Sequence, residues 1–222
     1  MKTLSKTELA VMMGRTLFPT TLKDTTKDIL GKTENVIKQS TNIKLGKRVT
    51  KGSLKGAKIF TVTLEERKTC PTSCAHWADC YGNNMPFATR YAANDDLEER
   101  MEKELAELQR KNPTGFLVRL HILGDFYSVG YVAKWGAWLT KFPALHVYGY
   151  TANQPDAIDA KERSIGQAIQ TIRAASADDE RAAPLVEAKK AFICPVQLDK
   201  TASCGSCGAC WSSTKPVVFL TH

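Results

Sequence analysis

The sequence predicts an α/β protein with a mainly parallel sheet, either open or rolled into a partial (β/α) barrel. Strand-like and helix-like segments alternate along most of the chain, which is typical of parallel strands joined by crossover helices. The chain has 222 residues, fewer than the roughly 250 typical of a closed eight-fold barrel. Seven cysteines stand in two groups, one after the first expected strand and one near the C-terminus.

The first expected strand covers residues 57–64, which are rich in β-branched and aromatic residues. A helix is expected over residues 94–111 because its apolar residues recur at spacings of four and three, which gives one apolar face. That face consists of Leu97, Met101, Leu105 and Leu108. The motif Asn112-Pro113 ends the helix.

The other expected elements follow in the same alternation. They are short helices at 6–13 and 25–37, a strand at 115–123, a helix at 131–141, a strand at 145–150, a helix at 156–177, and short strands at 191–194 and 217–220. We divide the chain into a basic N-terminal extension (1–41), an α/β core with the first cysteine group (42–193) and a cysteine-rich C-terminal segment packed on that core (194–222).

Positive charge is concentrated near the N-terminus. Residues 1–68 hold 15 Lys and Arg against 6 Asp and Glu, a net charge of +9. The whole chain has a net charge of +8, so the remaining residues together carry −1. A basic extension on a near-neutral body indicates a polyanionic partner, DNA or RNA, although a solvated surface has the same composition.

We expect a cytoplasmic protein. No apolar stretch approaches the roughly 20 residues that cross a membrane, and the first residues lack the pattern of a signal peptide. A reducing compartment disfavours disulfides, and the number of cysteines is odd. Clustered cysteines in such a protein indicate metal binding or redox chemistry.

The first cysteine group is Cys70, Cys74 and Cys80, with spacing C-x3-C-x5-C. Three thiolates can hold three irons of a [4Fe–4S] cluster and leave the fourth iron open to a ligand, and an open position distinguishes a catalytic metal from a structural one. A zinc site completed by His76 is the alternative.

The second group joins Cys194 to the run Cys204, Cys207 and Cys210. The C-x2-C-x2-C run resembles that of iron–sulfur ferredoxins, and its intervening glycines let the backbone wrap closely around a cluster. Four cysteines also suit a closed tetrathiolate zinc site. We favour iron–sulfur because the run is cramped for a zinc tetrahedron.

Polar residues follow the second and third expected strands. Gly124 allows close backbone approach, and Asp125 places a carboxylate at the mouth of the sheet, as a base, a nucleophile or a ligand for an amino group; helix capping is the structural alternative. His121 is expected to share a strand face with Arg119, as a catalytic residue or a core histidine.

Further polar residues lie near this mouth. Thr151 and Asn153 face it after the third strand, unless they form an ordinary turn. The residues after the first cysteine group could contact a ligand's polar edge or only form a turn and a helix start; they are Tyr81, Gly82, Asn83, Asn84 and Arg90.

Together these motifs resemble the phage and plasmid gene 88 protein family. The resemblance runs from about Asn42 to His222, and its most specific parts are GDFYS and the terminal CGSCGACW. The other matching stretches are KLG, TCP, CYG, RLHIL, YGYTAN and VVFLTH.

The family's layout is similar to that of phage proteins regarded as radical-SAM-like. That resemblance implies a cluster on the first cysteine group, S-adenosylmethionine bound near Gly124 and Asp125, and an auxiliary cluster on the second group, hence one or two [4Fe–4S] clusters. The radical SAM spacing is C-x3-C-x2-C, so this chain has a longer second interval. The host cytoplasm is the location this origin implies.

The expected function is therefore that of an iron–sulfur, radical-SAM-like protein acting on nucleic acid or a nucleotide. One alternative is a non-catalytic zinc protein that binds nucleic acid, with aromatic residues near the cysteines stacking on bases. A second alternative is a base-exchange enzyme, similar to a transglycosylase, with Asp125 as its nucleophile.

Overall fold

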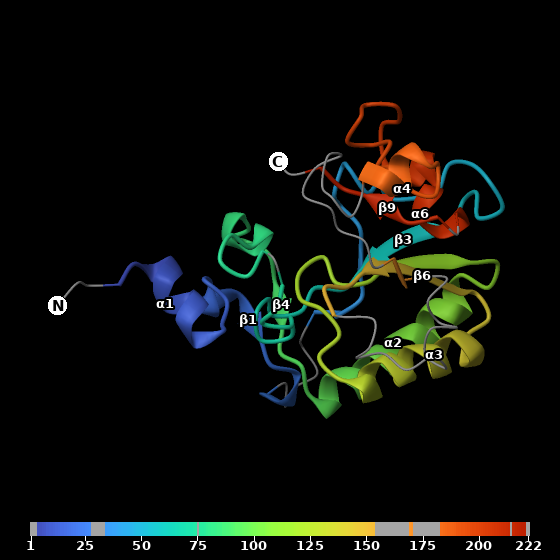
Figure 1. Cartoon of the computed structure of the whole chain (residues 1–222). Coiled ribbons are helices and arrows are strands. Elements are labelled where there is room, and N and C mark those ends of the chain that lie inside the picture. Colours follow the sequence, from blue (N-terminus) through green and yellow to red (C-terminus); the bar gives the residue numbers. More distant parts are fainter. Residues whose placement is uncertain are drawn as a thin grey trace.

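The computed structural model describes residues 4–27, 34–74, 76–153, 169–170, 183–213 and 215–220. Within these ranges, five strands form an open sheet in the order β2-β3-β5-β6-β7 (Figure 1). The strands are β2 (Lys38–Gln39), β3 (Lys58–Thr61), β5 (Phe116–Arg119), β6 (Leu145–Tyr150) and β7 (Ile169–Gln170). Strand β2 is antiparallel to β3, and the other four are parallel. The α/β prediction is confirmed, and the sheet is not a closed barrel.

Two helices cover one face of this sheet (Figure 1), α2 (Asp95–Lys111) and α3 (Val129–Lys141). Phe116 and Val118 of β5 pack into the same apolar cluster as the inner faces of both helices. The apolar stripe predicted on α2 is confirmed, because Leu97, Met101 and Leu105 are fully buried. Among the described residues, no helix combines the length and the apolar character that crossing a bilayer requires.

The cysteine-rich C-terminal segment covers the opposite face (Figure 1). Leu117 of β5 and Tyr148 of β6 point to this side and share a cluster with Cys194, Cys210 and Val217. The segment contains α5 (Cys204–Cys207), α6 (Ala209–Ser212) and β9 (Val217–Val218), and the residues before it form α4 (Ala183–Glu187) and β8 (Phe192–Ile193). Strands β8 and β9 pair in parallel.

The N-terminal residues lie beside the loop that follows β3. Helix α1 (Lys6–Met13) begins at a Ser5–Glu8 capping box and ends at Gly14, and β1 (Leu22–Lys23) pairs in parallel with β4 (Arg90–Tyr91). The short 3₁₀ helices are η1 (Pro19–Thr21), η2 (Thr25–Lys27) and η3 (Tyr81–Asn84).

Several elements differ from the sequence-based expectations. Strand β5 ends at Arg119, four residues early, and the backbone turns at His121 with φ 52°. Helix α3 begins two residues early because the Ser128 side chain accepts from the Tyr131 N–H. The helix expected at 25–37 is wrong where the structure describes it, since residues 34–37 are not helical and η2 is a single turn. The helix expected at 156–177 contains strand β7 and otherwise lies outside the described residues.

The second cysteine group is bonded directly to the basic segment 44–58. The amides of Cys204 and Gly205 donate to the carbonyls of Lys44 and Leu45, at 2.8 and 2.9 Å, and the Thr50 amide donates to the Gly205 carbonyl at 2.9 Å. A Cβ at Gly205 would overlap the Arg48 carbonyl. Two segments distant in sequence are thus held at backbone contact, which only a glycine allows here.

Replacing Gly205 by Ala should therefore destabilise the protein by about 1–3 kcal/mol, the usual effect of overpacking. Gly130→Ala is the matched control, because its Cβ would meet nothing closer than 3.8 Å and α3 favours Ala. Urea denaturation followed by circular dichroism measures both variants. Equal stabilities for the two would show that the segments are not in backbone contact at Gly205.

Candidate functional site

The loops that follow β3, β5 and β6 meet at one edge of the sheet. The Asp125 amide donates to Thr69 Oγ1 at 3.1 Å, and the Ala152 amide donates to Asp125 Oδ2 at 2.7 Å. The carboxyl ends of parallel strands share an edge, and this is where α/β proteins bind ligands. The structure therefore brings the first cysteine loop, Gly124–Asp125 and Thr151–Asn153 together.

Gly124 has a backbone conformation that favours glycine, with φ 81°. A Cβ there would lie 2.5 Å from Thr69 Oγ1 and 2.7 Å from Leu64 Cβ. Both observations require a residue without a side chain. Gly124 therefore lets the loop after β5 pack against the loop after β3.

Asp125 is 1% exposed, and both of its carboxylate oxygens accept backbone hydrogen bonds. Oδ1 accepts from the Phe126 amide at 2.8 Å, and Oδ2 accepts from Ala152. The helix-capping alternative is wrong, since Ser128 caps α3. The carboxylate instead ties the end of β5 to the end of β6.

Thr151 and Asn153 complete this joint. The Thr151 hydroxyl accepts from the Asn153 amide at 3.0 Å, and the Asn153 side chain donates to the Phe126 carbonyl at 3.1 Å. Thr151 is 1% exposed, whereas Asn153 is partly exposed. Asn153 is therefore the member of this pair that a ligand at the mouth can reach.

The thiols of the first group are electrostatic neighbours. Burial raises the pKa of Cys70 to about 12, and Asp125, Cys74 and Cys80 add to the rise. Burial also raises the pKa of Cys80, against the Gly82 amide, which donates to its sulfur at 3.4 Å. All three cysteines are partly exposed. A nearby cation would stabilise these thiolates, because burial and negative neighbours disfavour them.

The second group is more deeply placed. Cys194 and Cys210 are buried, and Cys204 and Cys207 are partly exposed. Burial raises the pKa of Cys204 to about 12 and that of Cys210 to about 11, and the other cysteines of the group contribute to both. The Tyr150 hydroxyl donates to the Cys210 sulfur at 2.8 Å. Cys194 and Cys210 thus pack against the face of the sheet opposite the helices, and Cys204 and Cys207 are their electrostatic neighbours.

Arg119 and His121 lie on opposite sides of the sheet, so the expectation of a shared face is wrong. The Arg119 guanidinium lies 4.5 Å from the centre of the Tyr150 ring, and its charge offsets part of the burial-driven rise in the pKa of Cys204 and Cys210. His121 is 1% exposed, and its Nε2 lies 3.2 Å from the Tyr131 hydroxyl in the helix-side core. The turn at His121 separates the two faces.

Sequence reasoning missed Arg119 and Tyr150 as partners of the second cysteine group. The period of two along a strand was a usable signal, because it places Arg119 on the same face as Leu117 and Tyr150 on the same face as Tyr148. The distance of about 60 to 90 residues between these strands and the cysteines hid the contact.

No three of the described His, Cys, Asp and Glu side chains are placed to ligate one metal ion. His76, the proposed zinc ligand, has its Nδ1 3.5 Å from Asp79. Within each group the thiols are close enough to influence one another's pKa, but among the described residues they do not form the coordination sphere of one ion. In an iron–sulfur cluster each cysteine binds a different iron, so the sulfurs need not converge on a single point.

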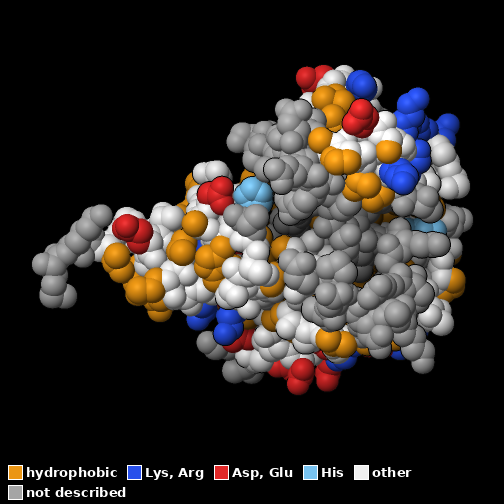
Figure 2. Space-filling model, viewed as in Figure 1, with side chains coloured by type: hydrophobic (Ala, Val, Ile, Leu, Met, Phe, Trp, Pro, Cys, Tyr) orange, Lys and Arg blue, Asp and Glu red, His pale blue; other side chains and the backbone are white. Residues whose placement is uncertain are grey.

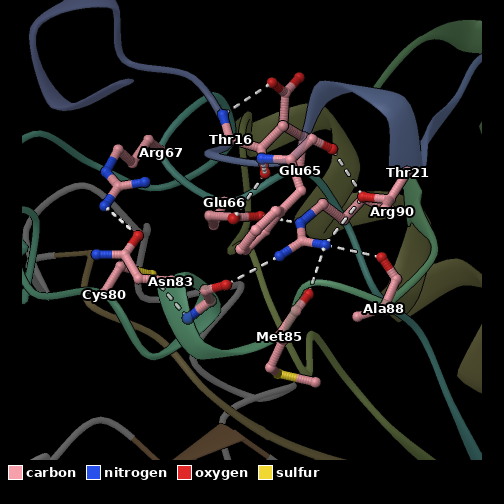
Figure 3. A network of polar contacts seen from close by, with 12 residues as sticks. Thr16, Thr21, Glu65, Glu66, Arg67, Cys80, Asn83, Met85, Ala88 and Arg90 are labelled. Atoms are coloured by element: carbon pink, nitrogen blue, oxygen red, sulfur yellow. Dashed lines mark hydrogen bonds and ion pairs between the residues drawn. The ribbon is translucent and has the colours of Figure 1, made fainter. Parts of the chain in front are cut away.

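A buried polar network holds the first cysteine loop (Figure 3). Arg90 and Glu66 form an ion pair of 2.6 Å between side chains that are both 0% exposed. The same guanidinium donates to the carbonyls of Gly82, Met85 and Ala88. Arg90 is thus a structural centre of the loop and does not line its surface, a role that the sequence did not reveal.

N-terminal residues complete the network (Figure 3). The Thr16 hydroxyl donates to Glu66 at 2.8 Å, and Arg15 pairs with Glu65 at 2.8 Å. Arg67 donates to the Trp77 carbonyl and to the Asn83 side chain, both at 2.9 Å or less. The loop between Cys74 and Cys80 is therefore fixed from inside and from the N-terminal side.

Tyr81 projects from this loop and is 60% exposed. It begins η3, immediately after Cys80. Phe87, in the same loop, is 94% exposed. Two exposed aromatic side chains thus lie within seven residues of Cys80 in the chain.

A family model described as gene product 88 matches residues 35–162, more than half of the chain. The chain belongs to the gene product 88 family. The matched range starts slightly before Asn42 and includes the first cysteine group, Gly124–Asp125 and Thr151–Asn153. It ends before the second cysteine group, so that part of the expected resemblance lies outside the matched range. Comparisons with curated proteins and with solved structures gave no match.

In this family member, Glu66→Ala should lower the free energy of unfolding by about 3–5 kcal/mol, because it leaves the buried Arg90 charge uncompensated. Glu107→Ala, which removes an exposed pair with Lys111, should leave the unfolding midpoint nearly unchanged. Urea denaturation of both variants tests this. A small effect at Glu66 would mean that water reaches the network.

Asp125→Asn should lower the free energy of unfolding by about 1–3 kcal/mol. The NH2 group of the new side chain would face the backbone N–H of Phe126 or of Ala152, which would leave that donor without its acceptor. Amide exchange at Phe126 and Ala152 should accelerate. Asp199→Asn is the control, since Asp199 is exposed and Asn tolerates its φ of 52°. Unchanged exchange at both amides would show that the carboxylate does not join the loops.

Proposed function

We propose that the chain is an iron–sulfur protein of the radical-SAM-like type that acts on nucleic acid or a nucleotide. In this proposal, Cys70, Cys74 and Cys80 hold an open cluster. The observation that carries it is the meeting of the first cysteine loop with Gly124–Asp125 and Thr151–Asn153 at the carboxyl edge of a parallel sheet.

The donor sets suit such clusters. The first group offers three partly exposed thiols, which leaves one iron for a ligand, and the second offers four thiols, two of them buried. Tyr150 donates to one sulfur, and Arg119 supplies positive charge; hydrogen bonds and charge near the sulfurs tune such clusters. Once bound, an open cluster supplies the electron for cleaving S-adenosylmethionine, and the protein binds, orients and shields the reactants.

The chain's own residues divide these tasks. Asp125 is a positioning residue, because its oxygens hold two loops together. In this proposal the ligand also contacts Asn153, which is partly exposed, and Tyr81, which is exposed beside Cys80. His121 supports the core beside Phe126, with ring centres 4.7 Å apart.

The alternatives receive less support. A base-exchange nucleophile must reach its substrate, and Asp125 is buried with both oxygens engaged by backbone amides. A zinc site on the first group was expected to use His76, whose side chain instead neighbours Asp79.

Anaerobic purification followed by iron, zinc and sulfide analysis tests the proposal. We expect a brown protein with about eight irons, and about four in either of two variants, C70A/C74A/C80A and C204A/C207A/C210A. S-adenosylmethionine should alter the electron paramagnetic resonance signal only where the first group is intact. A colourless protein with one or two zinc ions would overturn the proposal in favour of the zinc alternative.

A further inference from the structure

A pocket of about 390 Å³ opens where β3 and β5 begin, at the sheet edge opposite the first cysteine loop. Four cationic side chains line it: Arg48, Lys55, Lys58 and Lys111. No acidic or aromatic residue is among the described residues of its lining. Its volume lies within the range of small-molecule sites, so it can take a phosphodiester group.

The cations come from an unusually one-sided stretch of sequence. Residues 35–64 contain seven Lys and Arg and no Asp or Glu. Figure 2 shows Lys and Arg side chains gathered at the upper right of that view, on the side where the loop of this stretch lies in Figure 1. Like charges held close together repel, and a bound anion relieves that repulsion.

The backbone of this segment is fixed, which distinguishes the pocket from a set of freely moving surface lysines. The Val49 amide donates to the Ala57 carbonyl at 2.9 Å, and the Gly56 amide donates to the Val49 carbonyl at 2.8 Å. The Arg48 guanidinium donates to the Gly56 carbonyl at 3.0 Å. The docking of Gly205 onto the same segment holds its outer side. The cations are therefore presented on a rigid hairpin.

Lys111 contributes less than the hairpin cations. It pairs with Glu107 at 2.6 Å and lies at the C-terminal end of α2, which carries a negative partial charge. The positive potential of the pocket thus comes mainly from Arg48, Lys55 and Lys58.

We propose that this pocket binds a backbone phosphate of a nucleic acid. This inference rests on the proposed function for its choice of a nucleic-acid partner. Phosphate contacts position a nucleic acid without reading its sequence, which suits a pocket lined by cations and lacking aromatic side chains for stacking. It places the contact in residues 44–58 rather than in the extension 1–41.

Fluorescence anisotropy with a labelled single-stranded DNA of about 20 nucleotides tests the pocket. Lys55→Glu should weaken binding about tenfold at moderate salt and lower the salt-dependence slope by about one, the effect of losing one phosphate contact. Lys103→Glu is the control, because it makes the same charge change on the exposed side of α2. Equal binding by Lys55→Glu and the parent protein, or an equal loss in both variants, would overturn the proposal.

Two further measurements separate this proposal from the previous one. Iron content of Lys55→Glu should match that of the parent protein, so DNA binding that depends on Lys55 in a protein without iron would support the pocket and overturn the iron–sulfur function. Iron at the expected level, together with DNA binding that Lys55→Glu does not affect, would support the iron–sulfur function and overturn the pocket. Binding to phosphatidylserine vesicles without binding to DNA would assign the cations to a membrane surface and overturn the pocket.

Discussion

A carboxylate and a guanidinium that water does not reach must satisfy each other inside the protein, and Glu66 and Arg90 meet that requirement at the centre of the first cysteine loop. The loop has few apolar side chains to bury, so polar bonds take the place of a core. Arg90 binds three carbonyls of the loop itself, and Glu66 reaches Thr16 near the N-terminus. The position of the cysteines therefore depends on this pair.

The sheet separates two chemically different layers. Helices α2 and α3 give one face an apolar and aromatic core, and the C-terminal segment gives the other face its sulfur atoms. Strand β6 contacts the second cysteine group through Tyr150 and then leads directly to Thr151 and Ala152 at the mouth. Strand β6 therefore contacts the second cysteine group directly and leads to the residues that bond, through Asp125 and Thr69, to the loop of the first group.

Much of the fold was predictable because periodicity is a local property. The stripe of Leu97, Met101 and Leu105 identified α2, and β-branched and aromatic residues identified the strands. The convergence of Asp125 with Thr151 and Asn153 followed from the rule that parallel strands end at one edge. Predictions failed where a single local contact decided the outcome, as at His121, where the chain turns out of β5, and at Ser128, which caps α3.

By itself, the sequence determined the strand–helix alternation, the two cysteine groups and the polar residues at the strand ends, because each depends on neighbours in the chain. Tertiary structure alone decided that Arg119 and Tyr150 face the second cysteine group, that Arg90 is buried and that Arg48, Lys55 and Lys58 line a pocket with the end of α2. These arrangements join segments tens of residues apart. Burial, charge pairing and steric limits such as those at Gly124 and Gly205 select them only once the chain has folded.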